Sequence, residues 1–255
     1  MTTRAQPSQF PGGRERTRAP QTGTGAGGLR RRDAGLLTAA VLLAAAFFLA
    51  PPLLVPGGFG GFPHAFLAYW SSGRPDFPPG LQHLVDQQFR YHLVRVLIAV
   101  PLLAALVALA VRLRRFRLLF GVLALVAAAL LIENVQGVVS PFGTLLPQLA
   151  SGLAKPDRAA LVAQVRDQLA HGPKSPALHV MLDEYVRFHV VKAVLCCLLA
   201  ANLLGLSVAV WRRRHRWYSL LTALLAAAAL VVVVANVTTV ANPNPGFLPL
   251  LQGSW

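Results

Sequence analysis

The sequence predicts an all-α integral membrane protein with five transmembrane helices, four of them a bundle made of two parallel-repeat helical hairpins. Three observations predict this fold. The 255-residue chain is 55% hydrophobic and only 13% charged, with a mean hydropathy of +0.54, as expected for a chain solvated mainly by lipid. It contains apolar runs that are long enough to cross about 30 Å of hydrocarbon. Its arginine clusters and its polar residues also recur at fixed spacings.

The apolar runs divide the chain into segments. They extend over residues 34–55, 93–111, 118–139, 190–211 and 220–240. Residues 1–29 are rich in Gly, Pro, Thr and Arg, which predicts a disordered cytoplasmic tail. Residues 30–55 are predicted to be an uncleaved signal anchor, because the run ends in Pro51-Pro52 without a convincing small-x-small cleavage site. A cleaved signal peptide or a twin-arginine export signal is the alternative.

Three arginine clusters predict the orientation. They lie at residues 30–32, 112–117 and 212–216. The positive-inside rule puts all three on the cytoplasmic side only if the chain crosses the membrane five times. We therefore expect a multi-pass protein of a bacterial plasma membrane, with a cytoplasmic N-terminus and an external C-terminus. Basic residues that flank apolar runs indicate orientation in lipid rather than binding to nucleic acid, despite a net charge of +15.

An internal repeat is the most informative feature of the sequence. Residues 79–149 and 176–251 carry the same polar pattern. The matched positions are Asp86 and Asp183, Arg90 and Arg187, His92 and His189, Arg95 and Lys192, and Asn134 and Asn236. Matches of charged and polar residues in order do not follow from shared hydrophobicity. Two helices per copy give both copies one orientation, which predicts a parallel repeat about a pseudo-twofold axis along the membrane normal.

Two external segments surround the first repeat. Residues 150–175 are predicted to form an amphipathic linker, whose helix lies on the membrane or caps the bundle. Its apolar face carries Leu161, Val162, Val165 and Leu169. Residues 56–80 are rich in Gly, Pro and aromatic residues suited to the headgroup layer, namely Phe62, Phe66, Tyr69 and Trp70.

The matched polar residues predict a cationic site on the outer face, between the two repeats. It contains Arg90, Arg187, His92, His189, Arg95, Lys192, Asn134 and Asn236. An excess of guanidinium and ammonium groups suits a lipid headgroup, an anionic small molecule or a partner subunit. The competing interpretation is purely structural, with all cations paired by acidic residues. Those ion pairs would join Asp86 to Arg90, Asp183 to Arg187, and Glu133 to Arg95.

Two other functions stay open. His92 and His189 could ligate a haem group, or a transition metal together with His83 or His179. A small-molecule transporter working at the repeat interface is the other alternative, although the centres of the runs lack charges that an ion-coupled pump would need. The chain carries no Walker motif, nucleophile elbow or zincin helix, so we expect no enzyme, no cofactor and no resident metal. The partners that we consider are another membrane protein or a second copy of the chain. Cys196 and Cys197 are adjacent and point apart, which predicts no disulfide framework.

The ends of the two hairpins add a resemblance. Asn134-Val135-Gln136-Gly137 and Ala235-Asn236-Val237-Thr238-Thr239 resemble segments of uncharacterised polytopic membrane proteins of high-G+C Gram-positive bacteria. The resemblance implies a multi-pass location in the plasma membrane, and it implies no activity.

Overall fold

The computed structural model of the chain describes residues 2, 31–213 and 216–253. The predicted tail at residues 1–29 lies, apart from Thr2, outside the described residues. Every regular element in the described ranges is a helix, and no strand occurs there.

Five helices are long and apolar enough to cross a membrane. They are α1 (Arg31–Leu54), α3 (Pro79–Arg112), α4 (Arg117–Val139), α8 (Pro176–Arg212) and α9 (Arg216–Ala241). They confirm that the five apolar runs are helical. The 34 residues of α3 and the 37 of α8 extend about 50 Å and 55 Å at about 1.5 Å per residue. Both helices are therefore longer than the hydrocarbon is thick, and their first turns project beyond it.

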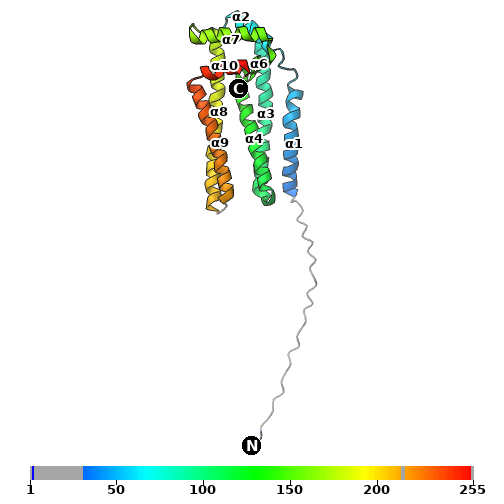
Figure 1. Cartoon of the computed structure of the whole chain (residues 1–255). Helices are drawn as coiled ribbons and strands as arrows, with labels where there is room; N and C mark the ends of the chain where they lie inside the picture. Colours follow the sequence, from blue (N-terminus) through cyan, green and yellow to red (C-terminus); the bar gives the residue numbers. More distant parts are fainter. Residues whose placement is uncertain (1, 3–30, 214–215, 254–255) are drawn as a thin grey trace.

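The long helices pack in a row. α3 and α4 form a first hairpin, closed by the short helix η1 (Arg114–Phe116), and α8 and α9 form a second. α1 packs against α3, and α4 packs against α8, so the order across the molecule is α1, α3, α4, α8, α9 (Figure 1).

This order corrects the expected closed bundle. A twofold axis between the hairpins would give α3 and α9 the same contact as α4 and α8. Among the described residues, α3 and α9 make no comparable contact. α1 packs along α3, so the first hairpin lies between α1 and the second hairpin instead of closing a ring with it.

Short helices form a layer across one end of the row, which we call the cap (Figure 1). They are α2 (Phe62–Ser72), α5 (Pro141–Leu145), α6 (Gln148–Gly152), α7 (Lys155–Ala170) and α10 (Asn244–Gln252). The cap has its own hydrophobic core, in which the side chains of Phe62, Phe66, Tyr69, Phe142 and Phe247 are almost completely buried. Burial of each large apolar side chain stabilises such a core by about 1.5 to 3 kcal/mol.

The cap corrects the expectation that the aromatic residues of α2 lie among lipid headgroups. Helix α7 buries Leu161, Val162 and Val165 against the same core. Trp70 stays partly exposed, and its Nε1 donates a hydrogen bond to Oε1 of Gln164 at 2.6 Å, which ties α2 to α7.

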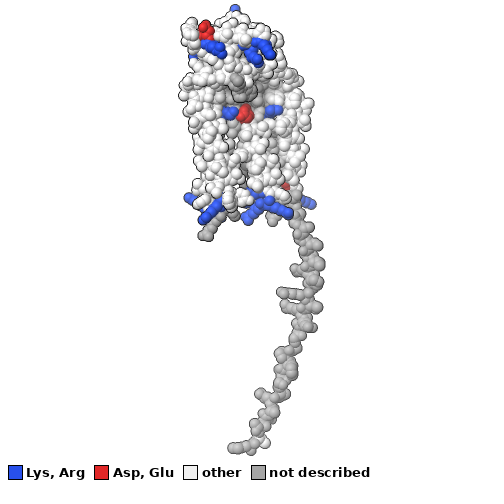
Figure 2. Space-filling model, viewed as in Figure 1, with Lys and Arg blue, Asp and Glu red and all other residues white. Residues whose placement is uncertain are grey.

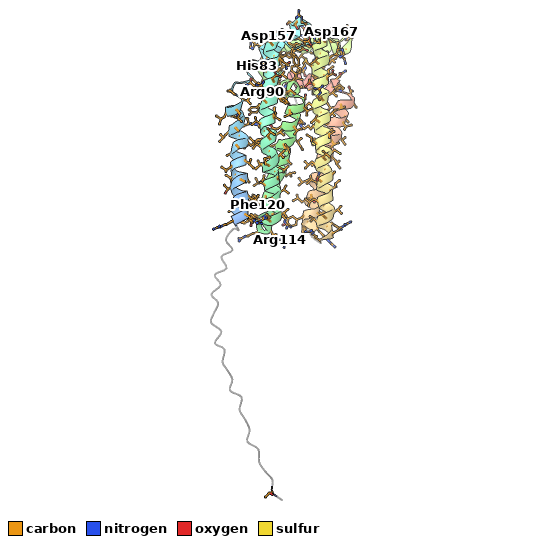
Figure 3. The ribbon with its side chains drawn as sticks, turned by 180° about the vertical axis from the view of Figure 1, so that it is seen from behind. His83, Arg90, Arg114, Phe120, Asp157 and Asp167 are labelled. Carbon is orange, nitrogen blue, oxygen red and sulfur yellow. The ribbon has the colours of Figure 1, made fainter. Side chains whose placement is uncertain are left out.

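The opposite end of the row is basic (Figure 2), and its basic residues are arginines. The start of α1 and the turns of both hairpins lie there (Figure 1), and Arg114 marks it in Figure 3, far from His83 and Arg90 near the cap. Asp33 of α1 accepts a hydrogen bond from Nε of Arg112 at 2.5 Å, which fixes α1 to α3 at this end. We call it the arginine-rich end.

Candidate functional site

A histidine and an asparagine join the two arms of each hairpin below the cap. In the first hairpin, Nδ1 of His92 lies 2.9 Å from Oδ1 of Asn134. In the second, Nδ1 of His189 lies 2.6 Å from Oδ1 of Asn236. Both asparagine side chains are buried. An interhelical hydrogen bond in apolar surroundings fixes how the two arms sit against each other.

The asparagine amides determine which histidine nitrogen carries a proton. Nδ2 of Asn134 donates to the carbonyl of Leu130 at 2.6 Å, and Nδ2 of Asn236 donates to the carbonyl of Val232 at 2.7 Å. The amide oxygens therefore face the rings and accept, so each histidine donates from Nδ1. In the first hairpin, Nε2 of the same ring then accepts a hydrogen bond from Nε2 of Gln88 at 3.0 Å.

These bonds bear on the haem hypothesis. A pair of axial histidines must offer a nitrogen lone pair to the iron from each side. His92 instead uses both ring nitrogens inside its own hairpin, and His189 lies in the other hairpin, bonded to its own asparagine. Among the described residues, no group of three or more His, Cys, Asp or Glu side chains could hold a metal ion. The bonding of the two histidines favours a structural role over ligation.

The surroundings of the two histidines differ in a compensating way. Gln88, next to His92, also donates to Oγ1 of Thr144 at 3.1 Å. The second hairpin has Tyr185 at the level of Gln88, and its ring packs edge-on against His189 with centroids 4.5 Å apart. A Cβ atom on Gly246 would lie 2.6 Å from the hydroxyl of this tyrosine. The hydrogen-bonded pair Gln88 and Thr144 of the first hairpin thus corresponds to the large Tyr185 beside Gly246 in the second.

Gly137 allows the close packing of the first hairpin. A Cβ atom at this position would lie 2.3 Å from the ring of His92. Real side chains do not approach so closely, so any larger residue at position 137 must displace the histidine from Asn134.

The matched cations of the two hairpins have different neighbours. Nζ of Lys192 lies 3.2 Å from Oε1 of Glu133, an ion pair that joins α8 to α4. Arg95 faces α1 instead. Its guanidinium carbon lies 5.1 Å from the ring centroid of Phe47 and 4.5 Å from that of Tyr91, and its Nη2 donates to the hydroxyl of Tyr91 at 2.6 Å.

The predicted ion pair between Arg95 and Glu133 is therefore wrong. Glu133 lies on α4, which packs on α8, so its carboxylate meets Lys192. Arg95 has no carboxylate partner among the described residues, and its Nε atom is buried without a hydrogen-bond partner. Figure 2 shows an acidic patch between basic ones in an otherwise uncharged belt below the cap.

The other two predicted ion pairs are also corrected. Arg187 pairs with Glu184 at 2.7 Å, not with Asp183. Glu184 is held there because its Oε2 and its backbone oxygen both accept from Oγ of the buried Ser140, at 2.8 Å and 2.9 Å. Asp86 accepts a hydrogen bond from Nε2 of Gln82 at 2.8 Å. In the described residues it makes no ion pair with Arg90, whose side chain is exposed near the cap (Figure 3).

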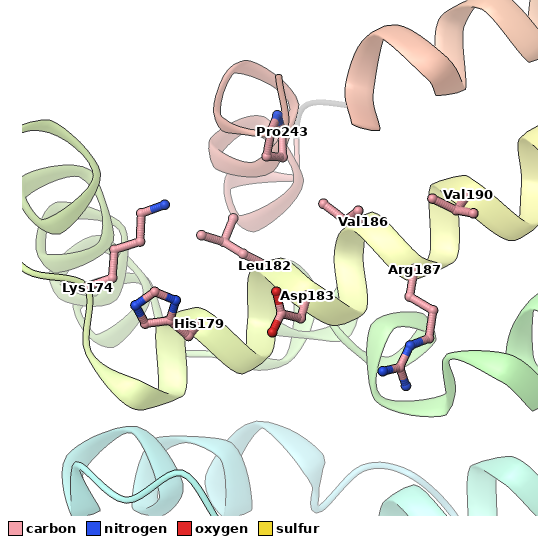
Figure 4. A pocket seen from close by; sticks show the side chains of 8 residues that line it. All are labelled: Lys174, His179, Leu182, Asp183, Val186, Arg187, Val190 and Pro243. Atoms are coloured by element: carbon pink, nitrogen blue, oxygen red, sulfur yellow. The ribbon is translucent and has the colours of Figure 1, made fainter. Parts of the chain in front are cut away.

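Asp183 and Arg187 line a pocket of about 430 Å³ at the cap end of α8. Lys174 and His179 lie at the same opening, with Pro243 of the opposite wall (Figure 4). The pocket is open, and it contains none of the first hairpin's predicted site residues.

The eight predicted site residues therefore do not converge on one cleft. Each histidine and asparagine pair closes its own hairpin, Arg95 faces α1, Lys192 faces α4, and Arg187 lies at the pocket in Figure 4. Sequence reasoning missed Phe47 and Gly137. Phe47 belongs to no polar motif that would point to it. For Gly137 the sequence offers one indication, because it lies four residues before Pro141.

Comparisons with protein-family models, with curated proteins and with solved structures found no match. The five apolar helices define the class of the protein on their own. It is a polytopic α-helical membrane protein, and its environment is a lipid bilayer.

Proposed function

We propose that the chain is a non-catalytic plasma-membrane protein that binds an anionic group at Arg95, close to the external surface. Three features of the molecule support this function: the orientation of the helices, the relation between the hairpins, and the uncompensated charge of Arg95.

The orientation follows from the arginine-rich end. All three arginine clusters have members at the end opposite the cap. These are Arg31 and Arg32, the arginines of the turn at residues 112–117, and Arg212, Arg213 and Arg216. By the positive-inside rule this end is cytoplasmic, which makes the cap external. Arg95 is 17 residues from Arg112, about 26 Å along α3. It therefore lies near the external edge of a hydrocarbon layer that is about 30 Å thick.

The two hairpins are proposed to be copies of one ancestral unit. Their first helices begin 97 residues apart, at Pro79 and Pro176, and their second helices end 102 residues apart, at Val139 and Ala241. The five extra residues of the second copy lie towards its turn, where α8 and α9 are longer than α3 and α4. The equivalent hydrogen bonds of His92 and His189 support the same relation.

Arg95 carries the functional proposal, because its charge has no counter-charge in the described chain. A cation near hydrocarbon is favourable only when it is solvated, paired or bound to an anion. Lys192 has Glu133, but Arg95 has two aromatic rings, one hydroxyl acceptor and a buried Nε without a partner. Its remaining guanidinium donors suit a phosphate or carboxylate, which can accept two parallel hydrogen bonds. The phosphate of an external-leaflet headgroup is the nearest such group.

The rival functions have less support. The haem hypothesis needs a free ring nitrogen on His92. Gln88 bonds one of its two ring nitrogens and Asn134 bonds the other. A transporter needs a substrate path between the copies. Where α4 packs against α8, Glu133 and Lys192 form an ion pair that links the two copies instead of lining such a path.

The proposal is tested by ligand-dependent melting of the purified full chain in nanodiscs. Glycerol-3-phosphate is the soluble probe, and phosphatidylglycerol against phosphatidylcholine nanodiscs is the lipid comparison. We expect glycerol-3-phosphate to raise Tm of the native protein in phosphatidylcholine nanodiscs by several degrees, and Arg95→Gln to abolish this shift. Exchange of phosphatidylcholine for phosphatidylglycerol should raise Tm of Arg95→Gln by less than it raises Tm of the native protein. Arg90→Gln, which removes an exposed cation from the same helix, should retain it. An equal shift in Arg95→Gln would show that the anion binds elsewhere.

A further inference from the structure

A long groove runs between the two hairpins on the side of α4 that faces α8 and α9. Its part near the arginine-rich end has a volume of about 310 Å³, and its part near the cap has about 290 Å³. Both parts are lined by Leu125, Leu203 and Leu225, so they adjoin. The groove extends from Arg117 to Glu133, 16 residues along α4, or about 24 Å. Its walls are mostly aliphatic.

The mouth of the groove is cationic. Arg114, Arg115 and Arg117 line it, and none of them has a carboxylate partner among the described residues. The one acidic side chain that the described chain has at this end is Asp33, which is paired with Arg112. Three guanidinium groups therefore meet an apolar groove that opens at the level of the headgroups.

We propose that this groove binds a phospholipid with an anionic headgroup, from the leaflet on the arginine-rich side. One acyl chain lies along the groove, and the phosphate is held by Arg114, Arg115 and Arg117. Basic pockets between transmembrane helices select anionic headgroups in this way, and guanidinium binds phosphate in a bidentate manner.

Charge also decides against a second copy of the chain as the occupant. A second copy in the same membrane has the same orientation, so its own arginines would meet these at the same depth. Like charges in contact oppose such pairing. An anionic lipid instead neutralises the three arginines and fills the apolar groove.

Gly121 offers a variant that blocks the groove without changing its charge. It lines the groove within α4, and a Cβ atom there meets nothing within 4 Å. A phenylalanine at this position fits the helix and fills the space of the acyl chain. Gly205 of α8 is the matched control, because its Cβ position is equally open and it does not line the groove.

The experiment is native mass spectrometry of the full chain with dioleoyl phosphatidylglycerol and dioleoyl phosphatidylcholine added in equal amounts. We expect the native protein to retain phosphatidylglycerol at least fivefold over phosphatidylcholine. We expect Gly121→Phe and the triple variant Arg114→Gln, Arg115→Gln, Arg117→Gln each to lower phosphatidylglycerol retention at least fivefold. Gly205→Phe should retain it. The same losses are expected when all variants are made in an Arg95→Gln background, which separates this groove from the site at Arg95.

Three outcomes would overturn the proposal. Equal retention of both lipids would show that the arginines do not select the headgroup. Unchanged retention in Gly121→Phe, with its melting temperature preserved, would place the lipid elsewhere. A native dimer that Gly121→Phe converts to a monomer would identify a second copy as the occupant.

Discussion

His92 donates a hydrogen bond from Nδ1 to Oδ1 of Asn134, at 2.9 Å, and so links α3 to α4 below the cap. His189 makes the same bond to Asn236 between α8 and α9. In both hairpins the amide nitrogen of the asparagine donates a hydrogen bond to the backbone carbonyl four residues earlier. The asparagine oxygen is therefore already turned towards the histidine ring. Each hairpin contains one such bond.

Removal of either asparagine should destabilise its hairpin. We expect Asn134→Ala and Asn236→Ala each to lower the free energy of unfolding by about 0.6 to 1.7 kcal/mol, between the average and the largest value for interhelical hydrogen bonds in membranes. Asn202→Ala is the control, because Asn202 is exposed and, within the described part of the chain, its side chain bonds only to the carbonyl of Leu198. Unfolding in mixed detergent measures the three values. Equal losses at all three positions would show that the interhelical bond contributes nothing.

Gly137→Ala tests the close approach of the first hairpin. A methyl group 2.3 Å from the His92 ring must displace that ring, at a cost of about 1 to 3 kcal/mol for an overpacked site. The double variant Gly137→Ala, His92→Ala removes the clash, so its loss should be smaller than the sum of the two single losses. Additive losses in this cycle would mean that the two residues do not meet.

Sequence patterns predicted the fold class because apolar length and composition determine which helices can lie in lipid. The five long helices follow from them. The cap could not be predicted in the same way, because its residues are short segments rich in Gly, Pro and aromatic side chains without clear periodicity. Phe62 and Phe66 look like headgroup residues by type, and only the approach of α7 and Phe142 encloses them.

The candidate site was predictable in part. The spacing of His92, Asn134, His189 and Asn236 singled out the residues that bond. The partner of Arg95 was not predictable, because a repeat says which positions match but not which neighbouring helix each copy faces. Helix α1 lies beside the first hairpin and carries Phe47 at that level, whereas α4 lies beside the second and carries Glu133.

Gln136 is completely buried in α4, and both polar atoms of its side chain lack a hydrogen-bond partner among the described residues. An unsatisfied buried amide is unfavourable, so Gln136→Leu should raise the free energy of unfolding by about 1 kcal/mol. Asn134→Leu, a matched change two residues earlier, should lower it. A loss of stability in Gln136→Leu would instead indicate that the amide binds water or a ligand.

The cap should become less stable at alkaline pH because of Tyr69. Burial, with a smaller effect of the Asp76 carboxylate, raises the pKa of this phenol above its usual value of 10.0. In the unfolded chain the phenol ionises near pH 10, while in the folded cap it stays neutral to higher pH. Its contribution to stability is therefore complete below pH 10 and is lost as the pH rises further.

Tyr69→Phe removes this dependence. We expect Tm of the native protein to fall more steeply between pH 9 and pH 11 than Tm of the variant. At pH 7 the variant should be slightly less stable, because it lacks the hydrogen bond from the hydroxyl to the carbonyl of Pro75, at 3.2 Å. Parallel pH curves for the two proteins would contradict the assignment to Tyr69.

The proposed orientation would put Arg95 at the external surface and the groove mouth at the cytoplasmic one, and its direct test is cysteine labelling in intact cells. In a background with Cys196→Ala and Cys197→Ala, Asp167→Cys on α7 and Arg114→Cys in the first turn report the two ends. Asp167 is exposed on the cap (Figure 3). With a membrane-impermeant maleimide, we expect position 167 to react in intact cells and position 114 to react only after permeabilisation. The reverse pattern would contradict the account, because it would place the cap in the cytoplasm.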